Sequence, residues 1–65
     1  MNWVPISAAV YKTKRQLDVS LFEALDALGG ACDKGVVTTK WDNEIQLVLD
    51  ASLRDWLKSV KRRRR

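Results

Sequence analysis

Histidine is absent from the 65 residues of this chain, and cysteine occurs once, as Cys32. The chain therefore lacks the commonest general base and the commonest metal ligand, and a single cysteine can form neither an intrachain disulfide nor a zinc site. No Ser/His/Asp set, glycine-rich phosphate loop or metal-ligand spacing occurs in it. We therefore expect a protein that is not an enzyme and that holds no metal or other cofactor.

Two further absences concern membranes. No apolar run approaches the roughly 20 residues that a membrane span needs, and the first residues lack the basic-then-apolar pattern of a secretory signal. We therefore expect a cytoplasmic protein without a membrane partner. With 46% hydrophobic and 31% charged residues, the composition is typical of one small globular domain with a thin core, and it favours a binding module.

Positive charge is concentrated at the C-terminus. The chain has 12 Lys and Arg against 8 Asp and Glu, but residues 61–65 hold five of the basic groups, so residues 1–60 carry seven basic and eight acidic groups. This distribution predicts a single domain over residues 1–60 and a solvated basic tail over residues 61–65. The usual partner of such a tail is a polyanion, most often nucleic acid. The alternatives are a solubilising terminus or a helix end that favours cations.

The first half of the chain predicts two helices. Residues 1–6 are typical of a short strand or arm, and Ser7 is placed to cap a helix over residues 8–16. A Ser-x-x-Glu capping box at Ser20 predicts the start of a second helix, which the Gly29-Gly30 pair is expected to end. The short segment between them indicates a helix-turn-helix or a helical hairpin.

The second half predicts a β-hairpin and a last helix. Residues 36–49 alternate as two strands around a two-residue turn at Asp42-Asn43. That pairing places four apolar residues on the core face of the hairpin: Val36, Ile45, Leu47 and Leu49. The last helix begins near Asp50 or Ser52, where Ser52 resembles a capping-box residue. Its apolar stripe should pack on the hairpin, and consists of Leu53, Trp56, Leu57 and Val60.

Three segments carry a resemblance to a known family. The first is an arm that leads into a polar helix, Trp3-Val4-Pro5-Ile6-Ser7. The second is similar to the Leu-Gly-Val-Ser run that often precedes a recognition helix, and reads Leu17-Asp18-Val19-Ser20. The third, residues 45–57, joins a return strand to a short capped helix. This order resembles the small winged helix-turn-helix proteins of the phage excisionase type, within the MerR-like group. The resemblance implies an α+β fold with two N-terminal helices, a β-hairpin wing and a C-terminal helix.

The resemblance also implies a function. Such a chain would be a small accessory protein that binds double-stranded DNA at the host cell nucleoid. It would act as a recombination directionality factor, bending DNA at attachment sites and directing an integrase toward excision, or as a small transcriptional regulator. The residues we expect to contact DNA are polar, basic or aromatic and lie in the first helix, at the start of the second, at the wing tip and in the tail: Lys12, Lys14, Arg15, Ser20, Lys40, Trp41, Asn43, Lys61, Arg62, Arg63, Arg64 and Arg65.

The second helix departs from the family pattern, because it carries acidic residues and no Lys or Arg. Carboxylates that face phosphates oppose binding. Either Ser20 and its neighbours enter the groove at an angle that keeps the acids away, or the helix faces a protein such as an integrase. In the second case the protein-facing residues are Phe22, Glu23 and Asp26.

Two alternatives remain open. Large aromatic residues are usually buried, so Trp41 could instead cover Val37 and Val48. Residues 24–57 also resemble the short phage head–tail joining proteins, which share a helix, hairpin, helix order and an arginine-rich end. The alternative function is therefore a protein-binding module of phage origin, such as a head–tail joining component or an inhibitor of a host enzyme.

Overall fold

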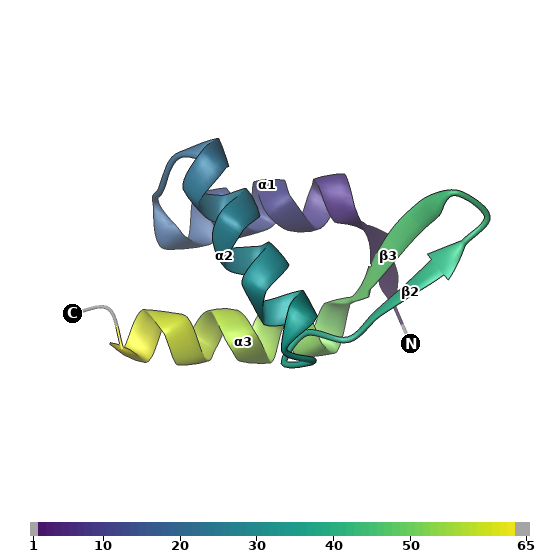
Figure 1. Ribbon diagram of the computed structural model, residues 1–65. Helices are drawn as coiled ribbons and strands as arrows, with labels where there is room; N and C mark the ends of the chain where they lie inside the picture. Colours follow the sequence, from purple (N-terminus) through teal and green to yellow (C-terminus); the bar gives the residue numbers. More distant parts are fainter. Residues whose placement is uncertain (1, 64–65) are drawn as a thin grey trace.

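The computed structural model of the chain describes residues 2–63. These residues form three helices and a three-stranded antiparallel sheet, in the α+β class and in the helix, helix, hairpin, helix order that the sequence predicts (Figure 1). The elements are β1 (Trp3–Pro5), α1 (Ile6–Leu17), α2 (Leu21–Asp33), β2 (Thr39–Asp42), β3 (Ile45–Leu49) and α3 (Asp50–Arg63). No helix within residues 2–63 is long and apolar enough to cross a membrane.

The sheet has the strand order β1-β3-β2, so β3 is the central strand. On one side Val4 of β1 pairs with Val48, and on the other Thr39 of β2 pairs with the same residue. The β2–β3 hairpin, which we call the wing, extends away from the helices at one end of the molecule (Figure 1). The predicted N-terminal arm is therefore an edge strand of the sheet.

The start of α1 differs from the prediction. We expected Ser7 to cap a helix over residues 8–16, but α1 begins at Ile6, and Pro5 is its N-cap without a side-chain cap. Pro5 has an extended backbone (φ −60°, ψ 150°), and proline lacks the N–H that a first helical turn leaves unpaired, so strand passes directly into helix. α1 ends at Leu17, and its C-cap Asp18 takes the left-handed conformation (φ 53°) at the position where the similar run has glycine.

The predicted cap of α2 is confirmed, because the Ser20 hydroxyl accepts a hydrogen bond from the Glu23 N–H at 3.1 Å. The predicted end of α2 is wrong: the helix continues through Gly29 and Gly30 to Asp33. Neither glycine has a positive φ. Gly35 does (φ 77°), in the turn after the helix, and is the glycine that the chain reversal uses.

The hairpin turn is also shifted. Asp42 pairs with Ile45, which leaves Asn43 and Glu44 as the two turn residues instead of Asp42-Asn43. Asn43 supplies the positive φ (58°) of this turn.

The face that packs on the helices is the opposite of the predicted one. Val48 is fully buried and Val37 nearly so, whereas Val36 and Ile45 are more than half exposed, and Leu47 and Leu49 are half-buried. The prediction chose the hairpin face with more apolar residues as the core face, and that choice is wrong. β1 and β3 join α1 and α3 without a loop, and these two junctions decide which side of the sheet the helices cover.

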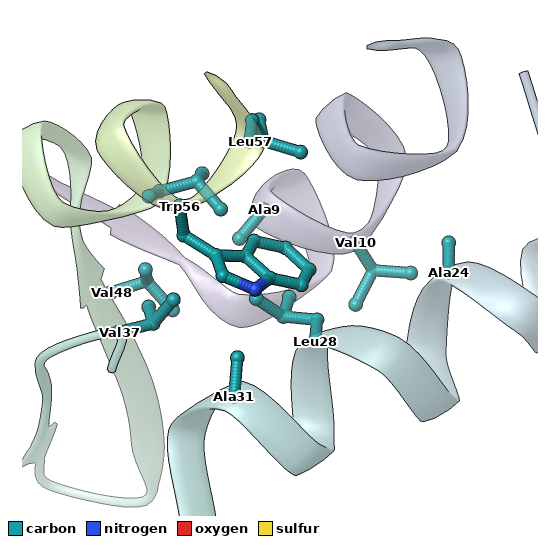
Figure 2. Packing of buried hydrophobic residues seen from close by; sticks show 10 residues of the cluster. Ala9, Val10, Ala24, Leu28, Ala31, Val37, Val48, Trp56 and Leu57 are labelled. Atoms are coloured by element: carbon teal, nitrogen blue, oxygen red, sulfur yellow. The ribbon is translucent and has the colours of Figure 1, made fainter. Parts of the chain in front are cut away.

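The core lies where the three helices meet the sheet. Figure 2 shows the indole of Trp56 reaching from α3 toward Leu28 of α2, with Ala9 of α1 and Val48 of β3 nearby. The predicted stripe of α3 is confirmed as core: Leu53, Trp56 and Leu57 are buried and Val60 is partly buried. This stripe packs on helices as well as on the sheet, and not on the hairpin alone. The predicted cap at Ser52 is wrong, because α3 begins at Asp50 and the Ser52 hydroxyl donates to the Leu49 carbonyl.

Candidate nucleic-acid interface

A shallow groove runs between α1 and α3. Residues one and two helical turns apart share one face of a helix, so Arg54, Lys58 and Lys61 project from the same side of α3. They line the groove together with Leu57 and with Lys12 and Gln16 of α1. The Lys61 ammonium donates a 2.7 Å hydrogen bond to the Gln16 side-chain oxygen, which joins the two walls. The groove thus collects four cations from segments that are far apart in the sequence.

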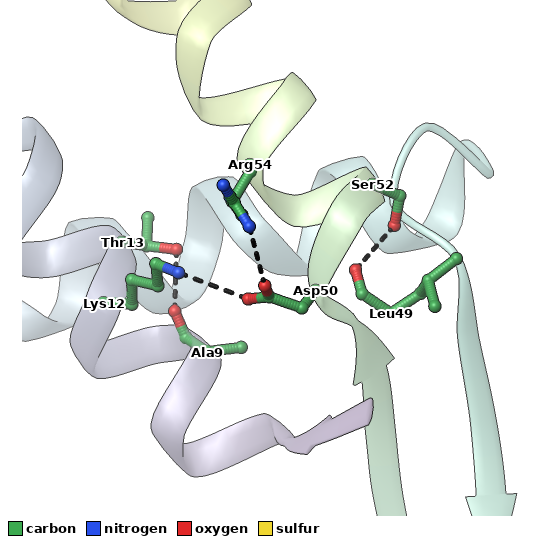
Figure 3. A network of polar contacts seen from close by, with 7 residues as sticks. All are labelled: Ala9, Lys12, Thr13, Leu49, Asp50, Ser52 and Arg54. Carbon is green, nitrogen blue, oxygen red and sulfur yellow. Dashed lines mark hydrogen bonds and ion pairs between the residues drawn. The ribbon is translucent and has the colours of Figure 1, made fainter. Parts of the chain in front are cut away.

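Asp50 neutralises part of this charge and fixes its geometry (Figure 3). Its carboxylate lies 3.2 Å from the Lys12 ammonium and 3.5 Å from the Arg54 guanidinium, and the side chain is only 15% exposed. The hydrogen bond from Lys12 lowers the pKa of Asp50 below its ordinary value, outweighing the opposite effect of burial. The Asp50 N–H also donates to the Asn2 carbonyl. Asp50 is therefore ionised at neutral pH and holds Lys12 at the edge of the groove.

A second hollow continues this surface over α1. It is lined by Ala8, Tyr11, Lys12, Arg15 and Gln16, and it shares Lys12 and Gln16 with the groove. We call the combined surface the basic face and define it by its cations, Lys12, Arg15, Arg54, Lys58 and Lys61. No carboxylate of the described residues lines either hollow. Five cations and the paired carboxylate of Asp50 give this face a net positive charge.

The basic face contains three of the predicted DNA-contacting residues and two that the sequence reasoning missed. Lys12, Arg15 and Lys61 lie together, although they come from distant parts of the chain. Arg54 and Lys58 were not predicted, yet their spacing to Lys61 on a helix whose apolar stripe was recognised would have found them. Lys14 lies about 200° around α1 from Lys12, since each residue turns the helix by about 100°, and it lines neither hollow.

The first residues of the predicted basic tail belong to α3. Lys61, Arg62 and Arg63 are the last residues of α3, so the helix extends into the segment predicted as a basic tail. All three are exposed, and cations at the C-terminal end of a helix interact favourably with its dipole. Arg64 and Arg65 lie outside the described residues.

The wing residues lie apart from the groove. The Lys40 ammonium sits 4.3 Å from the ring centroid of Trp3, on the sheet face turned away from the core. Trp41 is 67% exposed, so the alternative in which it covers Val37 and Val48 is wrong. Asn43 is exposed in the hairpin turn. None of these residues lines the two hollows of the basic face.

The predicted residues of α2 occupy a different surface again. Phe22, Glu23 and Asp26 are exposed and line a hollow on the outer side of α2. Ser20 is exposed at the start of the helix, where its hydroxyl caps Glu23. The acidic helix thus does not share its exposed surface with the five cations. Among residues 2–63 no cluster of His, Cys, Asp and Glu side chains is suited to hold a metal ion.

Comparison of the chain with known protein families, with curated proteins and with solved structures finds no match.

Proposed function

We propose that the chain is a small accessory protein that binds double-stranded DNA through the basic face. The observation that carries this proposal is the convergence of Lys12, Arg15, Arg54, Lys58 and Lys61 on one surface of α1 and α3, where the described residues place no unpaired carboxylate. Lysine and arginine side chains on such a surface neutralise phosphates, and the release of condensed counterions supplies most of the affinity for nonspecific DNA.

Two further features support the same proposal. Arg62 follows Lys58 by four residues, so it extends the positive surface along the last turn of α3. The wing presents an exposed Trp41 beside the turn residue Asn43, which are side chains suited to a groove or to a base edge. The binding geometry differs from that of the resembled family, because α1 and α3 would carry the phosphate contacts while the acidic α2 faces away from them.

Within this class, the resemblance favours a recombination directionality factor of the excisionase type, and a small transcriptional regulator is the other member. Electrophoresis of duplexes carrying the bound site at different positions tests the directionality factor, because a directionality factor bends its DNA. Binding without bending contradicts a directionality factor and leaves the regulator.

The salt dependence of DNA binding tests the basic face. Each phosphate neutralised contributes about 0.9 to the slope of log affinity against log salt concentration. We expect Lys58→Ala together with Lys61→Ala to lower that slope by roughly 1 to 2, about one unit for each phosphate that is no longer neutralised. The control is Lys34→Ala, which removes one positive charge from the turn after α2, off the basic face, and its slope is compared with those of Lys58→Ala and Lys61→Ala made singly.

Equal slopes for the single variants and the control would contradict the proposal, because charge removed anywhere would then have the same effect. Complete loss of binding in a variant lacking residues 62–65, with no effect of Lys58 or Lys61, would assign the contact to the terminal arginines instead. Melting temperatures of all variants show that the fold is retained.

A further inference from the structure

The outer side of α2 exposes apolar side chains that nothing in the described part of the chain covers. Phe22 is 83% exposed, and Leu21 and Leu25 are 54% and 50% exposed. Phe22 and Leu25 lie one helical turn apart and line the same shallow hollow. Aromatic side chains bury a large apolar area when they are covered, so an exposed phenylalanine beside an exposed leucine is typical of an interaction surface.

Carboxylates surround this apolar centre. Glu23, Asp26 and Asp33 line the same hollow, and α2 contains no Lys or Arg. Within residues 2–63 none of the three takes part in an ion pair, although Arg63 and Lys34 line a neighbouring hollow on the Asp26 side. The surface therefore repels DNA and attracts a cationic partner. A second copy of the chain that docked with the same face would bring like charges together.

Two glycines in the middle of α2 point to a partner that approaches closely. A Cβ atom added to Gly29 or Gly30 would meet nothing within 4 Å, so the packing within the chain does not require either glycine. Glycine weakens a helix interior relative to alanine. Both residues line the hollow with Phe22 and Leu25, where they leave the helix backbone open to close contact.

We infer that the outer face of α2, defined by Phe22, Glu23, Leu25, Asp26, Gly29 and Asp33, docks an amphipathic basic helix of another protein. The apolar stripe of that helix packs on Phe22 and Leu25, its lysines and arginines pair with the surrounding carboxylates, and its backbone crosses α2 at Gly29. This surface lies on a different element from the basic face. The chain can therefore bind DNA and a protein at the same time, which goes beyond the proposed DNA binding.

The probe for this inference is a synthetic 18-residue peptide of leucine and lysine with the leucines on one helical face. One control peptide has the same composition in scrambled order, so it keeps the charge and loses the stripe. A second control has glutamate in place of lysine. Each peptide is titrated into the full chain, and binding is monitored by calorimetry and by the NMR shifts of backbone amides. Only the striped lysine peptide should show saturable binding, with the largest shifts in α2.

Four variants of the chain locate the contact. Phe22→Ala should weaken binding by about tenfold or more, since aromatic residues at the centre of an interface often dominate its affinity, and its melting temperature should hardly change. Ile45→Ala, which removes an apolar side chain exposed to 56% at the start of β3, is the matched control and should bind normally. Glu23→Gln with Asp26→Asn should weaken binding and reduce its salt dependence. Gly29→Ala should raise the melting temperature and yet weaken binding.

Several results would overturn the inference. If the scrambled peptide binds equally well, nonspecific charge attraction explains the binding and no apolar stripe is recognised. If Phe22→Ala keeps the full affinity for the peptide, the contact lies elsewhere. Self-association that depends on Phe22 would identify a second copy as the occupant. Shifts of α2 amides on addition of duplex DNA would make this helix a DNA-binding element. DNA affinity is measured on the same variants, so failure of this inference leaves the proposed function independently testable.

Discussion

Replacing Val37 with alanine should destabilise the protein far more than the same replacement at Val36, its neighbour in sequence. Val37 is 1% exposed and packs in the core, whereas Val36 is 54% exposed. The substitution removes two carbon atoms, each worth about 0.8 kcal/mol when fully buried, so Val37→Ala should cost about 1.5 kcal/mol plus a contribution from the cavity. Val36→Ala should cost roughly half of the transfer value or less, because half of the side chain already contacts water.

The assay is thermal unfolding followed by circular dichroism, with urea unfolding as a second measurement. In a domain of this size 1 kcal/mol shifts the melting temperature by about 4 to 8 °C, so Val37→Ala should melt roughly 6 to 12 °C below the unsubstituted chain. Val36→Ala should stay within about half of that shift. Both N–H groups donate to the Ala31 carbonyl, and alanine preserves these bonds, so the comparison isolates the side chains. A larger loss in Val36→Ala would show that the opposite face of the hairpin is buried.

Three other outcomes are expected. Leu57→Ala, at a residue 4% exposed, should cost about 2 to 5 kcal/mol in urea unfolding, whereas Leu25→Ala, at 50% exposure, should cost about 1 kcal/mol. The pKa of Asp50 is lowered in the folded protein, so its ion pair with Lys12 stabilises the fold fully at pH values above the pKa of the unfolded chain, about 3.9. This stabilisation is lost as the pH falls through the pKa of the folded protein. Asp50→Asn should therefore be less stable at neutral pH and lose less stability on acidification, which urea midpoints at several pH values will measure. Glu23→Gln should leave DNA affinity equal or higher in a gel-shift titration, because it removes a charge that repels phosphate and keeps a side chain suited to the capping box.

Local signals predicted the helices well. The Ser20 cap depends on a side chain and an N–H three residues apart, and the stripe of α3 depends on a spacing within one helix. Both are properties of a short segment, so the sequence contains them in full. The same reasoning failed at the Gly29-Gly30 pair, because two glycines lower helix stability without preventing a helix that packing holds on both sides of the pair.

The face of the hairpin could not be predicted from the hairpin alone. Alternation grouped the residues into two faces correctly, and the structure keeps Ile45, Leu47 and Leu49 together. Which group is buried depends on where α1 and α3 leave the sheet, and that is a property of the whole fold. The exposed Ile45 and the buried Val48 are therefore an outcome of tertiary structure.

The candidate interface was predictable only in part for a similar reason. Charge runs in the sequence drew attention to Lys12, Lys14 and Arg15 and to the terminal block, and helix geometry then separates Lys14 from the other two. Arg54 and Lys58 occur singly in the sequence among acidic and apolar neighbours, so no run marks them. They become part of one surface because Leu57 and its stripe set α3 against α1.

The central position of β3 has a consequence for the order of folding. Its partner β1 lies at the other end of the chain, since Trp3 pairs with Leu49, so nearly every other element must be present before this pairing can close. Pairings between distant residues form late, because closing the long loop costs entropy before the pairing stabilises it. The α1–α2 pair is joined by a short turn and can form early, whereas β1, which continues directly into α1, can join the sheet only after the hairpin has formed. On a ribosome the first strand would wait unpaired until Leu49 has left the exit tunnel, and the edge of β3 that β1 covers is exposed only from then until the two strands pair.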